Sequence, residues 1–299
     1  MNVVITGANS AVGQAILRWM TAHPDAPVTC VAAVRSERAA DEIRHLAGER
    51  NSLLRVAYDD PASLDAAFRD ASAVIHLAGI LVEYPGSTYE QANVASTRAI
   101  IEAAKRNGVG KIVLVSAVGA SETSPNRYWL TKGHAENLVR DSGLSYTVIR
   151  PPLLLGPGTE GSAALKRNAS RQKVTLIAGG RNIQQPLHVD DLAHAAIVAT
   201  QPLVANNLTL ELVGPTALPD REIVERAASL MGHQVRIRSV PKALTALGIS
   251  IRQRLGRGGL SRDALDVITA DTAIDPLPAA TALGIQLTDI DRMISSSLG

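Results

Sequence analysis

The 299-residue chain is 46% hydrophobic and carries a formal net charge of +2. A chain of this length and composition can bury a large core, which excludes a disordered protein. Its basic residues are spread along the sequence, so a nucleic-acid-binding protein is not expected.

The sequence also constrains the compartment. Its single cysteine, Cys30, excludes an intramolecular disulfide and fits a reducing environment, where we expect it to act as a small core hydrophobe. The first apolar run begins at Asn2, which leaves no room for a signal peptide, and no run of about 18 apolar residues occurs. We therefore expect a cytoplasmic protein without an integral membrane segment.

Apolar runs that are typical of buried strands alternate with helical patterns through the first half of the chain. The predicted strands cover 2–6, 27–34, 52–57, 72–78, 110–116 and 145–150. This alternation predicts an α/β fold with a doubly wound parallel sheet of the Rossmann type. Ligands on such a sheet bind beyond the carboxyl ends of its strands.

The composition of the sequence changes after Arg150, where a Pro- and Gly-rich stretch precedes shorter predicted elements. We expect residues 1–152 to form a dinucleotide-binding domain. Residues 153–299 are expected to form a smaller mixed segment that is interleaved with the main domain and helps to bind the substrate.

A glycine-rich turn, "ITGANSAVG", follows the first strand and leads into a helix. Gly7 allows the tight turn, and Gly13 allows the helix to pack closely on the strand. Ser10 stands where a glycine often permits close approach to pyrophosphate, and its hydroxyl could donate to a phosphate. The candidate binding residues of this turn are Gly7, Asn9, Ser10, Ala11, Val12 and Gly13.

The end of the second strand bears on the type of dinucleotide. An acidic residue there binds a free ribose 2′-hydroxyl, whereas arginine accommodates a 2′-phosphate. This sequence has Arg35 at that place, followed by Ser36 and Arg38. The sequence thus favours NADP(H) over NAD(H).

Several motifs in chain order resemble the extended or atypical branch of the short-chain dehydrogenase/reductase superfamily. They are "TGANSAVG", "VIHLAG" (74–79), "NVASTRAIIEAA" (93–104), "VLVSAVGA" (113–120), "YWLTK" (128–132), "VIRPPLLLGPG" (148–158) and "QPLHVDDLAHA" (185–195). The segments "SPNRYWLTKGHAE" and "LVGPTALPDREIVERAASLMGHQVRIRSVP" look most similar to the atypical group around the 39-kilodalton subunit of respiratory complex I.

The resemblance implies a catalytic Tyr-x-x-x-Lys pair, matched by Tyr128 and Lys132. The two side chains lie one helical turn apart on the same face of a helix. The Lys132 ammonium can therefore lower the pKa of the Tyr128 phenol and bind the nicotinamide ribose, while Tyr128 exchanges a proton with the substrate. The family normally has a catalytic hydroxyl residue well upstream of the tyrosine, but this sequence has Val118 at about that position. Ser116, Ser121 and Ser124 are the candidate substitutes, of which Ser116 lies at the strand end.

The resemblance further implies that Leu77, Ala78 and Gly79 line the adenosine and ribose and that Pro151 borders the nicotinamide. It gives Asn93 an architectural role. The third strand departs from the family: Ala57 or Tyr58 stands where an aspartate is often found near adenine. Asp59 and Asp60 are interpreted as caps of the helix that begins near Pro61.

A metal site is not expected. His188, Asp190 and Asp191 lie close in sequence, but no further ligand set of recognised spacing accompanies them. Asp190 or Asp191 is interpreted as the cap of the following helix, and His76 as a strand or cavity-wall residue.

The densest positive cluster lies at 252–262, with Arg252, Arg254, Arg257 and Arg262. Its simplest interpretation is a solvated face. The alternative is a docking surface for a protein partner or for an anionic membrane surface.

These observations support two hypotheses of different class. The first is an NADP(H)-dependent oxidoreductase that acts on a small-molecule substrate through Tyr128 and Lys132. The second is a non-catalytic NADPH-binding accessory or sensor protein, which the valine at 118 favours. A sugar-nucleotide epimerase is a less favoured variant because it would use tightly held NAD.

Overall fold

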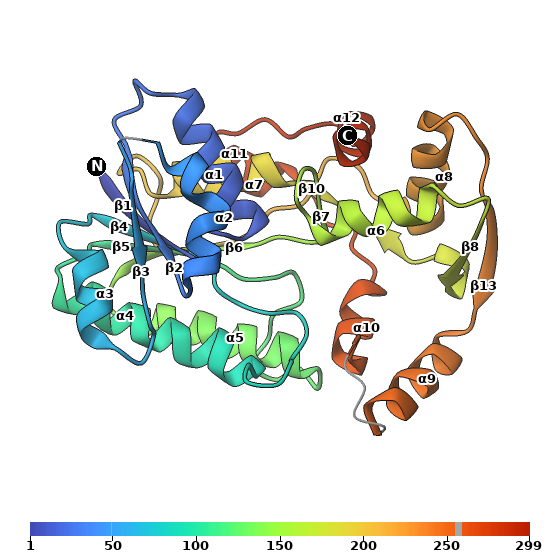
Figure 1. The fold of residues 1–299 in the computed structure, drawn as a ribbon, viewed down its shortest axis with the longest axis horizontal. Helices are drawn as coiled ribbons and strands as arrows, with labels where there is room; N and C mark the ends of the chain where they lie inside the picture. Colours follow the sequence, from blue (N-terminus) through green and yellow to red (C-terminus); the bar gives the residue numbers. More distant parts are fainter. Residues whose placement is uncertain (49, 255–258) are drawn as a thin grey trace.

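The computed structural model describes residues 1–48, 50–254 and 259–299. Its centre is a seven-stranded parallel sheet in the order β11-β6-β5-β4-β1-β2-β3 (Figure 1). The strands are β1 (Asn2–Thr6), β2 (Thr29–Val34), β3 (Ser52–Arg55), β4 (Ala73–His76), β5 (Lys111–Val115), β6 (Ser145–Arg150) and β11 (Leu208–Glu211). The predicted Rossmann-type sheet is confirmed, and the six predicted strands occur with their ends shifted by no more than two residues.

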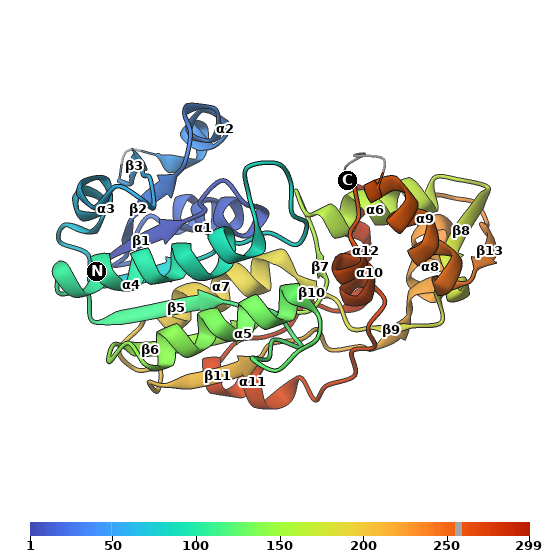
Figure 2. The same ribbon diagram turned by 90° about the horizontal axis from the view of Figure 1, so that it is seen from below.

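Helices cover both faces of this sheet (Figures 1 and 2). One face packs on α1 (Ala11–Ala22), α2 (Glu37–Ala47), α7 (Val189–Ala199) and α11 (Leu277–Leu283). The other packs on α3 (Pro61–Phe68), α4 (Ser96–Arg106) and α5 (Arg127–Arg140). The inner strands β1, β2, β4 and β5 consist mainly of Val, Ile, Ala and Leu because both of their faces are buried, whereas the edge strands β3 and β11 are partly exposed. Cys30 is among these buried residues, and burial raises the pKa of its thiol to about 12.

The strand order reverses at β1, whose neighbours are β2 on one side and β4 on the other. The chain segments that leave β1 and β4 therefore diverge and open a crevice at the carboxyl edge of the sheet. The segment after β4 is long and irregular, and it ends in the π-helical turn η1 (Glu90–Ala95), which continues into α4.

A smaller lobe lies beyond the end of the sheet (Figure 2). Its own apolar core joins α6 (Glu160–Ala169), β8 (Lys173–Ile177), α8 (Asp220–Leu230) and α12 (Ile290–Leu298). The strand β13 (Arg236–Val240) pairs in parallel with β8 and leads into α9 (Lys242–Arg254) and α10 (Arg262–Ile268). The short elements between them are β7 (Leu154–Leu155), η2 (Ala178–Gly180), β9 (Ile183–Gln184), β10 (Leu187–His188) and β12 (Leu218–Pro219).

The two lobes interleave in the chain. After the first small-lobe elements, α7 packs on α1 and β11 adds to the edge of the main sheet beside β6. The chain then returns to the small lobe with α8. None of the helices in the described ranges is long and apolar enough to cross a membrane.

Candidate functional site

The glycine turn after β1 has two positions that need glycine. Gly7 has a φ of 72°, and a Cβ there would lie 3.1 Å from the amide nitrogen of Ala78. A Cβ on Gly13 would lie 2.4 Å from the carbonyl oxygen of Ala8. Ser10 caps α1, because its Oγ accepts a hydrogen bond of 3.2 Å from the Gly13 amide. Its hydroxyl hydrogen is free to point elsewhere.

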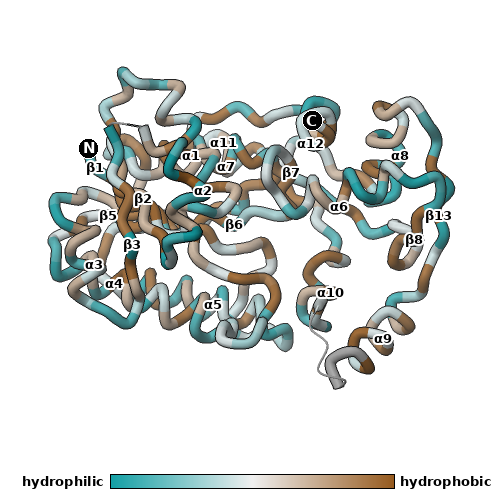
Figure 3. The backbone as a smooth tube through the Cα atoms, in the orientation of Figure 1, coloured by the Kyte–Doolittle hydropathy of each residue, from teal (hydrophilic) through white to brown (hydrophobic). Residues whose placement is uncertain are grey.

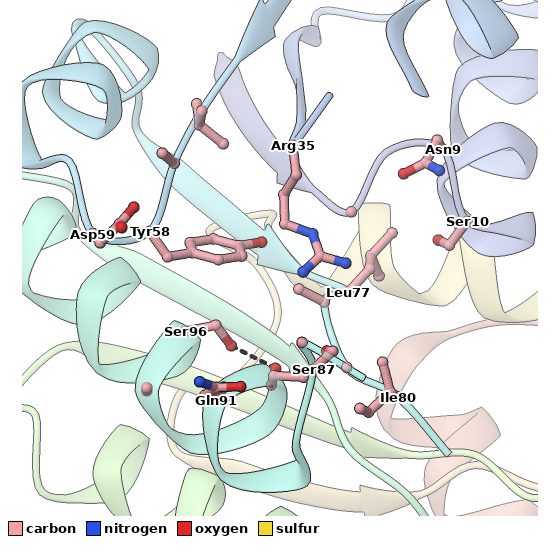
Figure 4. A pocket seen from close by; sticks show the side chains of 18 residues that line it. Asn9, Ser10, Arg35, Tyr58, Asp59, Leu77, Ile80, Ser87, Gln91 and Ser96 are labelled. Carbon is pink, nitrogen blue, oxygen red and sulfur yellow. Dashed lines mark hydrogen bonds between the residues drawn. The ribbon is translucent and has the colours of Figure 1, made fainter. Parts of the chain in front are cut away.

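A cavity of about 610 Å³ opens beside this turn at the carboxyl edge of the sheet (Figure 4). Its volume falls in the range of small-molecule sites. The Arg35 side chain projects into its middle from the end of β2, between Tyr58 and Leu77 (Figure 4). Seven of the predicted site residues line it: Gly7, Asn9, Ser10, Arg35, Leu77, Ala78 and Gly79.

Arg35 and Arg38 differ sharply in their surroundings. Arg35 lines the cavity, whereas the Arg38 side chain is 91% exposed and pairs with Glu42 at 3.3 Å. Ser36 caps α2 through its hydroxyl. The positive charge offered to a ligand in the cavity is therefore that of Arg35.

The wall opposite the glycine turn was missed by the sequence analysis. It contains Tyr58 and Asp59 after β3, Gln91 in η1 and Ser96 at the start of α4 (Figure 4). Burial raises the pKa of the Tyr58 phenol to about 12, so it is a neutral group. Of the two predicted helix caps, only Asp60 is confirmed, since it accepts from the Ala62 amide; Asp59 faces the cavity instead.

His76 lies under this wall at the end of β4. Its Nδ1 is 2.6 Å from the Thr6 hydroxyl, and its ring meets that of Tyr58 edge to face. Its Nε2 has no hydrogen-bond partner in the described part of the chain. Burial, helped by the charge of Lys132, lowers the pKa of His76 to about 3. The imidazole is therefore a neutral, buried strand residue, one of the two predicted roles, and it does not itself line the cavity.

Lys132 connects the cavity to α5. Its Nζ donates to the carbonyl oxygen of Val115 at 3.0 Å, and a Cβ on Gly79 would lie 3.1 Å from the same Nζ. The ammonium thus lies against the strip of backbone that lines the cavity. Burial lowers the pKa of Lys132 to about 8. Asn93 crosslinks the same region, since it donates to Thr131 and accepts from the Ile80 amide, in agreement with its predicted architectural role.

Tyr128 precedes Lys132 by one helical turn but does not line the cavity. Its ring packs edge to face on Tyr89, with 5.9 Å between the centroids. Burial, reinforced by Tyr89, raises the pKa of the Tyr128 phenol above its usual value. The expected lowering of this pKa by Lys132 is therefore absent in this structure, because desolvation dominates.

Tyr89 itself is fully buried and fixed at several points. Its hydroxyl donates to the Leu81 carbonyl at 2.7 Å and lies 3.3 Å from the Ser261 hydroxyl. Glu83 accepts from the Tyr89 amide and pairs with Arg127 at 2.8 Å. Segment 81–89 and the start of α10 therefore meet at Tyr89, which in turn packs on Tyr128. This cover is partial, because Tyr128 keeps some exposure to solvent.

The candidate hydroxyls lie in three different environments. Ser116 is 4% exposed, and its Oγ makes no hydrogen bond of standard geometry with a described residue. The Oγ of Ser121 lies 3.2 Å from that of Thr123, and the Oγ of Ser124 accepts from the Asn126 amide. Val118 holds Trp129 through its carbonyl.

A buried ion-pair cluster lies behind Ser116. Burial alone would raise the pKa of Glu136, but hydrogen bonds from Arg150 and Arg140, with the Ser116 hydroxyl close by, lower it below its usual value. The side chain of Glu136 is fully buried, and both arginines approach it to 2.7 Å. Ser116 thus lies nearer to a structural network than to an open cavity.

The remaining predicted site residues lie outside the cavity lining. Ala11, Val12 and Gly13 form the first turn of α1, and Pro151 follows β6, where its carbonyl accepts from the Val118 amide. Ser116, Tyr128 and Lys132 complete this set.

The predicted cap of α7 was wrong. His188 is the cap, and its side chain accepts from the Asp190 amide. Asp190 is instead 3.7 Å from Arg18, and Asp191 binds the amide and hydroxyl of Thr288 at 2.8 Å each. A histidine cap has no strong sequence signal, whereas aspartate does, which explains the error.

The described residues contain no cluster of His, Cys, Asp and Glu that could hold a metal ion. Of the predicted arginine cluster, Arg262 donates from Nε to the Ser250 hydroxyl at 2.9 Å. Arg257 lies outside the described residues, as do the side chains of Arg252 and Arg254.

Comparison with known proteins is consistent with this geometry. A family model described as NAD(P)H-binding matches residues 7–178. A ceramide reductase of Caulobacter vibrioides is 29% identical over 181 residues, 60% of this chain and 57% of that protein. NADH dehydrogenase (ubiquinone) 1 alpha subcomplex subunit 9 of Arabidopsis thaliana, a mitochondrial protein, is 32% identical over 196 residues, 62% of this chain and 48% of that protein. The chain therefore matches about half the length of these relatives.

The fold is shared with a solved enzyme. The NADPH-dependent quinone oxidoreductase of Escherichia coli, complexed with NADPH, superposes with a TM-score of 0.75 at 21% identity and covers 99% of this chain and 100% of that one. At this identity the likeness shows the fold.

Proposed function

Because the chain belongs to the NAD(P)H-binding family, and within it to the extended and atypical short-chain dehydrogenases/reductases, we propose that it is an NADPH-dependent oxidoreductase. Its substrate would be a small molecule with a carbonyl, an imine or an activated double bond. One observation carries the proposal: a single cavity joins the glycine turn, Arg35 and the Gly79 backbone that touches Lys132.

The cavity fits a dinucleotide in size and in chemistry. The Ser10 turn at the start of α1 offers backbone N–H groups and the positive end of the helix dipole to a pyrophosphate. Gly7 and Gly79 pack closely on their neighbours in the cavity wall, because a Cβ would lie 3.1 Å from the Ala78 amide nitrogen at Gly7 and 3.1 Å from Lys132 Nζ at Gly79. Arg35 supplies the cation that a 2′-phosphate needs, since a guanidinium can bind two phosphate oxygens at once. We therefore propose NADP(H) rather than NAD(H).

When bound in this cavity, NADPH would supply the hydride for the proposed reduction. Tyr128 would give its proton to the substrate oxygen, a role that suits a phenol kept neutral by burial. Lys132, fixed by the Val115 carbonyl beside Gly79, would hold the nicotinamide ribose and stabilise the developing phenolate. Residues 153–299, which form the smaller segment interleaved with the main domain, would bind the substrate.

A second candidate is an NADPH-binding accessory or sensor protein that does not turn over. It is favoured by the cover over Tyr128 and by Val118, together with the environments of Ser116, Ser121 and Ser124. A sugar-nucleotide epimerase is less favoured, because Arg35 suits a 2′-phosphate that NAD lacks.

The cofactor assignment can be tested by thermal-shift titration with NADPH, NADP⁺, NADH and NAD⁺. Binding to the folded state raises the melting midpoint, and we expect the shift to be largest for the phosphorylated pair. Arg35→Ala should weaken NADPH binding by about 10- to 100-fold, as expected for a lost charge-assisted hydrogen bond, and leave NADH binding unchanged. Arg38→Ala is the matched control and should change neither. An unchanged preference in Arg35→Ala would refute the assignment.

A further inference from the structure

The helix α9 carries an apolar stripe on its exposed side. Leu244 is 59% exposed, Leu247 is 54% exposed and Ile251 is 51% exposed. Their spacing of three and four residues places them on one face of the helix. A surface helix ordinarily turns polar residues outward, so this arrangement is inverted. Figure 3 shows hydrophobic colouring along part of α9, at the edge of the small lobe.

The stripe belongs to a strongly basic part of the chain. Between Glu225 and Asp263 every charged residue is lysine or arginine. The whole chain has a net charge of only +2, so the rest of it is net acidic. Within the described residues, Arg236 and Arg238 of β13, just before α9, are exposed and form no ion pair with another described residue. Lys242 is paired with Asp266 at 2.8 Å and is left out of this set.

We propose that α9 docks this protein on an anionic lipid surface, with Leu244, Leu247 and Ile251 inserted among the lipids and Arg236 and Arg238 facing the headgroups. The charge of this region is opposite to that of acidic lipids. A lipid surface suits a single amphipathic helix with a basic flank, and the three side chains need not meet a complementary shape. A stable protein interface needs about 800 Å² from each partner, which is more than one such stripe supplies.

The docking surface is tied to the candidate active site. The Arg262 guanidinium donates to Ser250 of α9, and Ser261 caps α10 next to the hydroxyl of Tyr89. Asp263 accepts from the Arg127 amide, one residue before Tyr128. A protein bound through α9 would therefore hold the cover of Tyr128 close to the lipid surface, where an apolar substrate would be concentrated.

Co-sedimentation of the full chain with vesicles tests this proposal. The chain should pellet with vesicles of mixed phosphatidylcholine and phosphatidylglycerol, much less with phosphatidylcholine alone, and less as salt is raised. The triple variant Leu244→Ser, Leu247→Ser and Ile251→Ser should bind mixed vesicles at least about tenfold more weakly. Arg236→Gln and Arg238→Gln should each weaken binding to mixed vesicles by about fivefold.

Leu277→Ser is the matched control, since Leu277 in α11 is 67% exposed and should leave vesicle binding unchanged. Equal melting midpoints and equal NADPH-induced shifts would show that the variants fold. The proposal fails if the chain ignores both kinds of vesicle, binds them equally, or binds mixed vesicles as well in the triple variant as in Leu277→Ser. A dimer that the triple variant abolishes, without vesicle binding, would assign the stripe to a second copy of the chain and overturn it as well.

Discussion

The cofactor half and the catalytic half of the candidate site are built in different ways. The cofactor half consists mainly of short turns at the ends of β1, β2, β3 and β4, and it is open to solvent as a cavity. The proposed catalytic half around Tyr128 is assembled from segment 81–89, the start of α5 and the start of α10, and it is partly covered by Tyr89. The proposed cofactor binding therefore depends mainly on backbone geometry at the strand ends, whereas access to Tyr128 depends on contacts between distant segments.

The largest expected effect separates the two halves directly. Tyr128→Phe removes the proposed proton donor but keeps the ring that packs on Tyr89, so turnover should fall by about 100- to 10,000-fold. The NADPH-induced melting shift should remain, because Tyr128 does not line the cavity. The measurement is NADPH oxidation with a panel of small and long-chain ketones. Loss of the NADPH shift in this variant would show that the two halves are not separable.

Lys132 lies where the two halves meet. Because its pKa is lowered, we expect the unfolding free energy of the cofactor-free protein to depend on pH. Burial lowers its folded-state pKa to about 8 from 10.5, so between these pH values the unfolded chain binds more protons than the folded one. Stability should then rise with pH across this window through Lys132, by up to about 1.4 kcal/mol per pH unit.

The test compares urea unfolding of the wild type and Lys132→Met from pH 7.5 to about 9.5, below the range where tyrosines titrate. The difference in unfolding free energy between the two proteins should move in favour of the wild type as pH rises. A difference independent of pH would mean that Lys132 is not buried as the structure has it.

A smaller effect is expected from the cover itself. Tyr89→Phe removes the hydroxyl that donates to the Leu81 carbonyl and lies near Ser261, which should cost about 1 kcal/mol of stability. Tyr146→Phe is the control, because its phenol makes no hydrogen bond with a described residue. Denaturant midpoints would measure both. Equal midpoints would indicate that the cover is held by apolar packing and not by this hydroxyl.

The sequence predicted those parts of the molecule that are set by local rules. Buried aliphatic runs predicted the six strands. The predictions that Gly7 needs a positive φ and that Gly13 allows close packing were also confirmed. Arg35 could be placed in the cavity because the end of β2 is a fixed point of this fold.

The rest of the site depends on long-range packing. Tyr58 and Gln91 reach the cavity because the fold brings the end of β3 and the turn η1 together at the crevice between β1 and β4. The irregular segment after β4 has no hydrophobic periodicity, so the sequence could not predict the path that brings it next to Tyr128. The pKa of Tyr128 rises mainly through burial and also through the nearby Tyr89, 39 residues away in the chain. The spacing of Tyr128 and Lys132 had predicted the opposite direction.

A crystal structure of the protein with NADPH would test the central claim most directly. The account predicts that the 2′-phosphate lies within hydrogen-bond distance of the Arg35 guanidinium, the pyrophosphate lies on the Ser10 turn, and the nicotinamide ribose lies beside Lys132 Nζ. A dinucleotide that left the 2′-phosphate in solvent, away from Arg35, or that bound outside this cavity would contradict it.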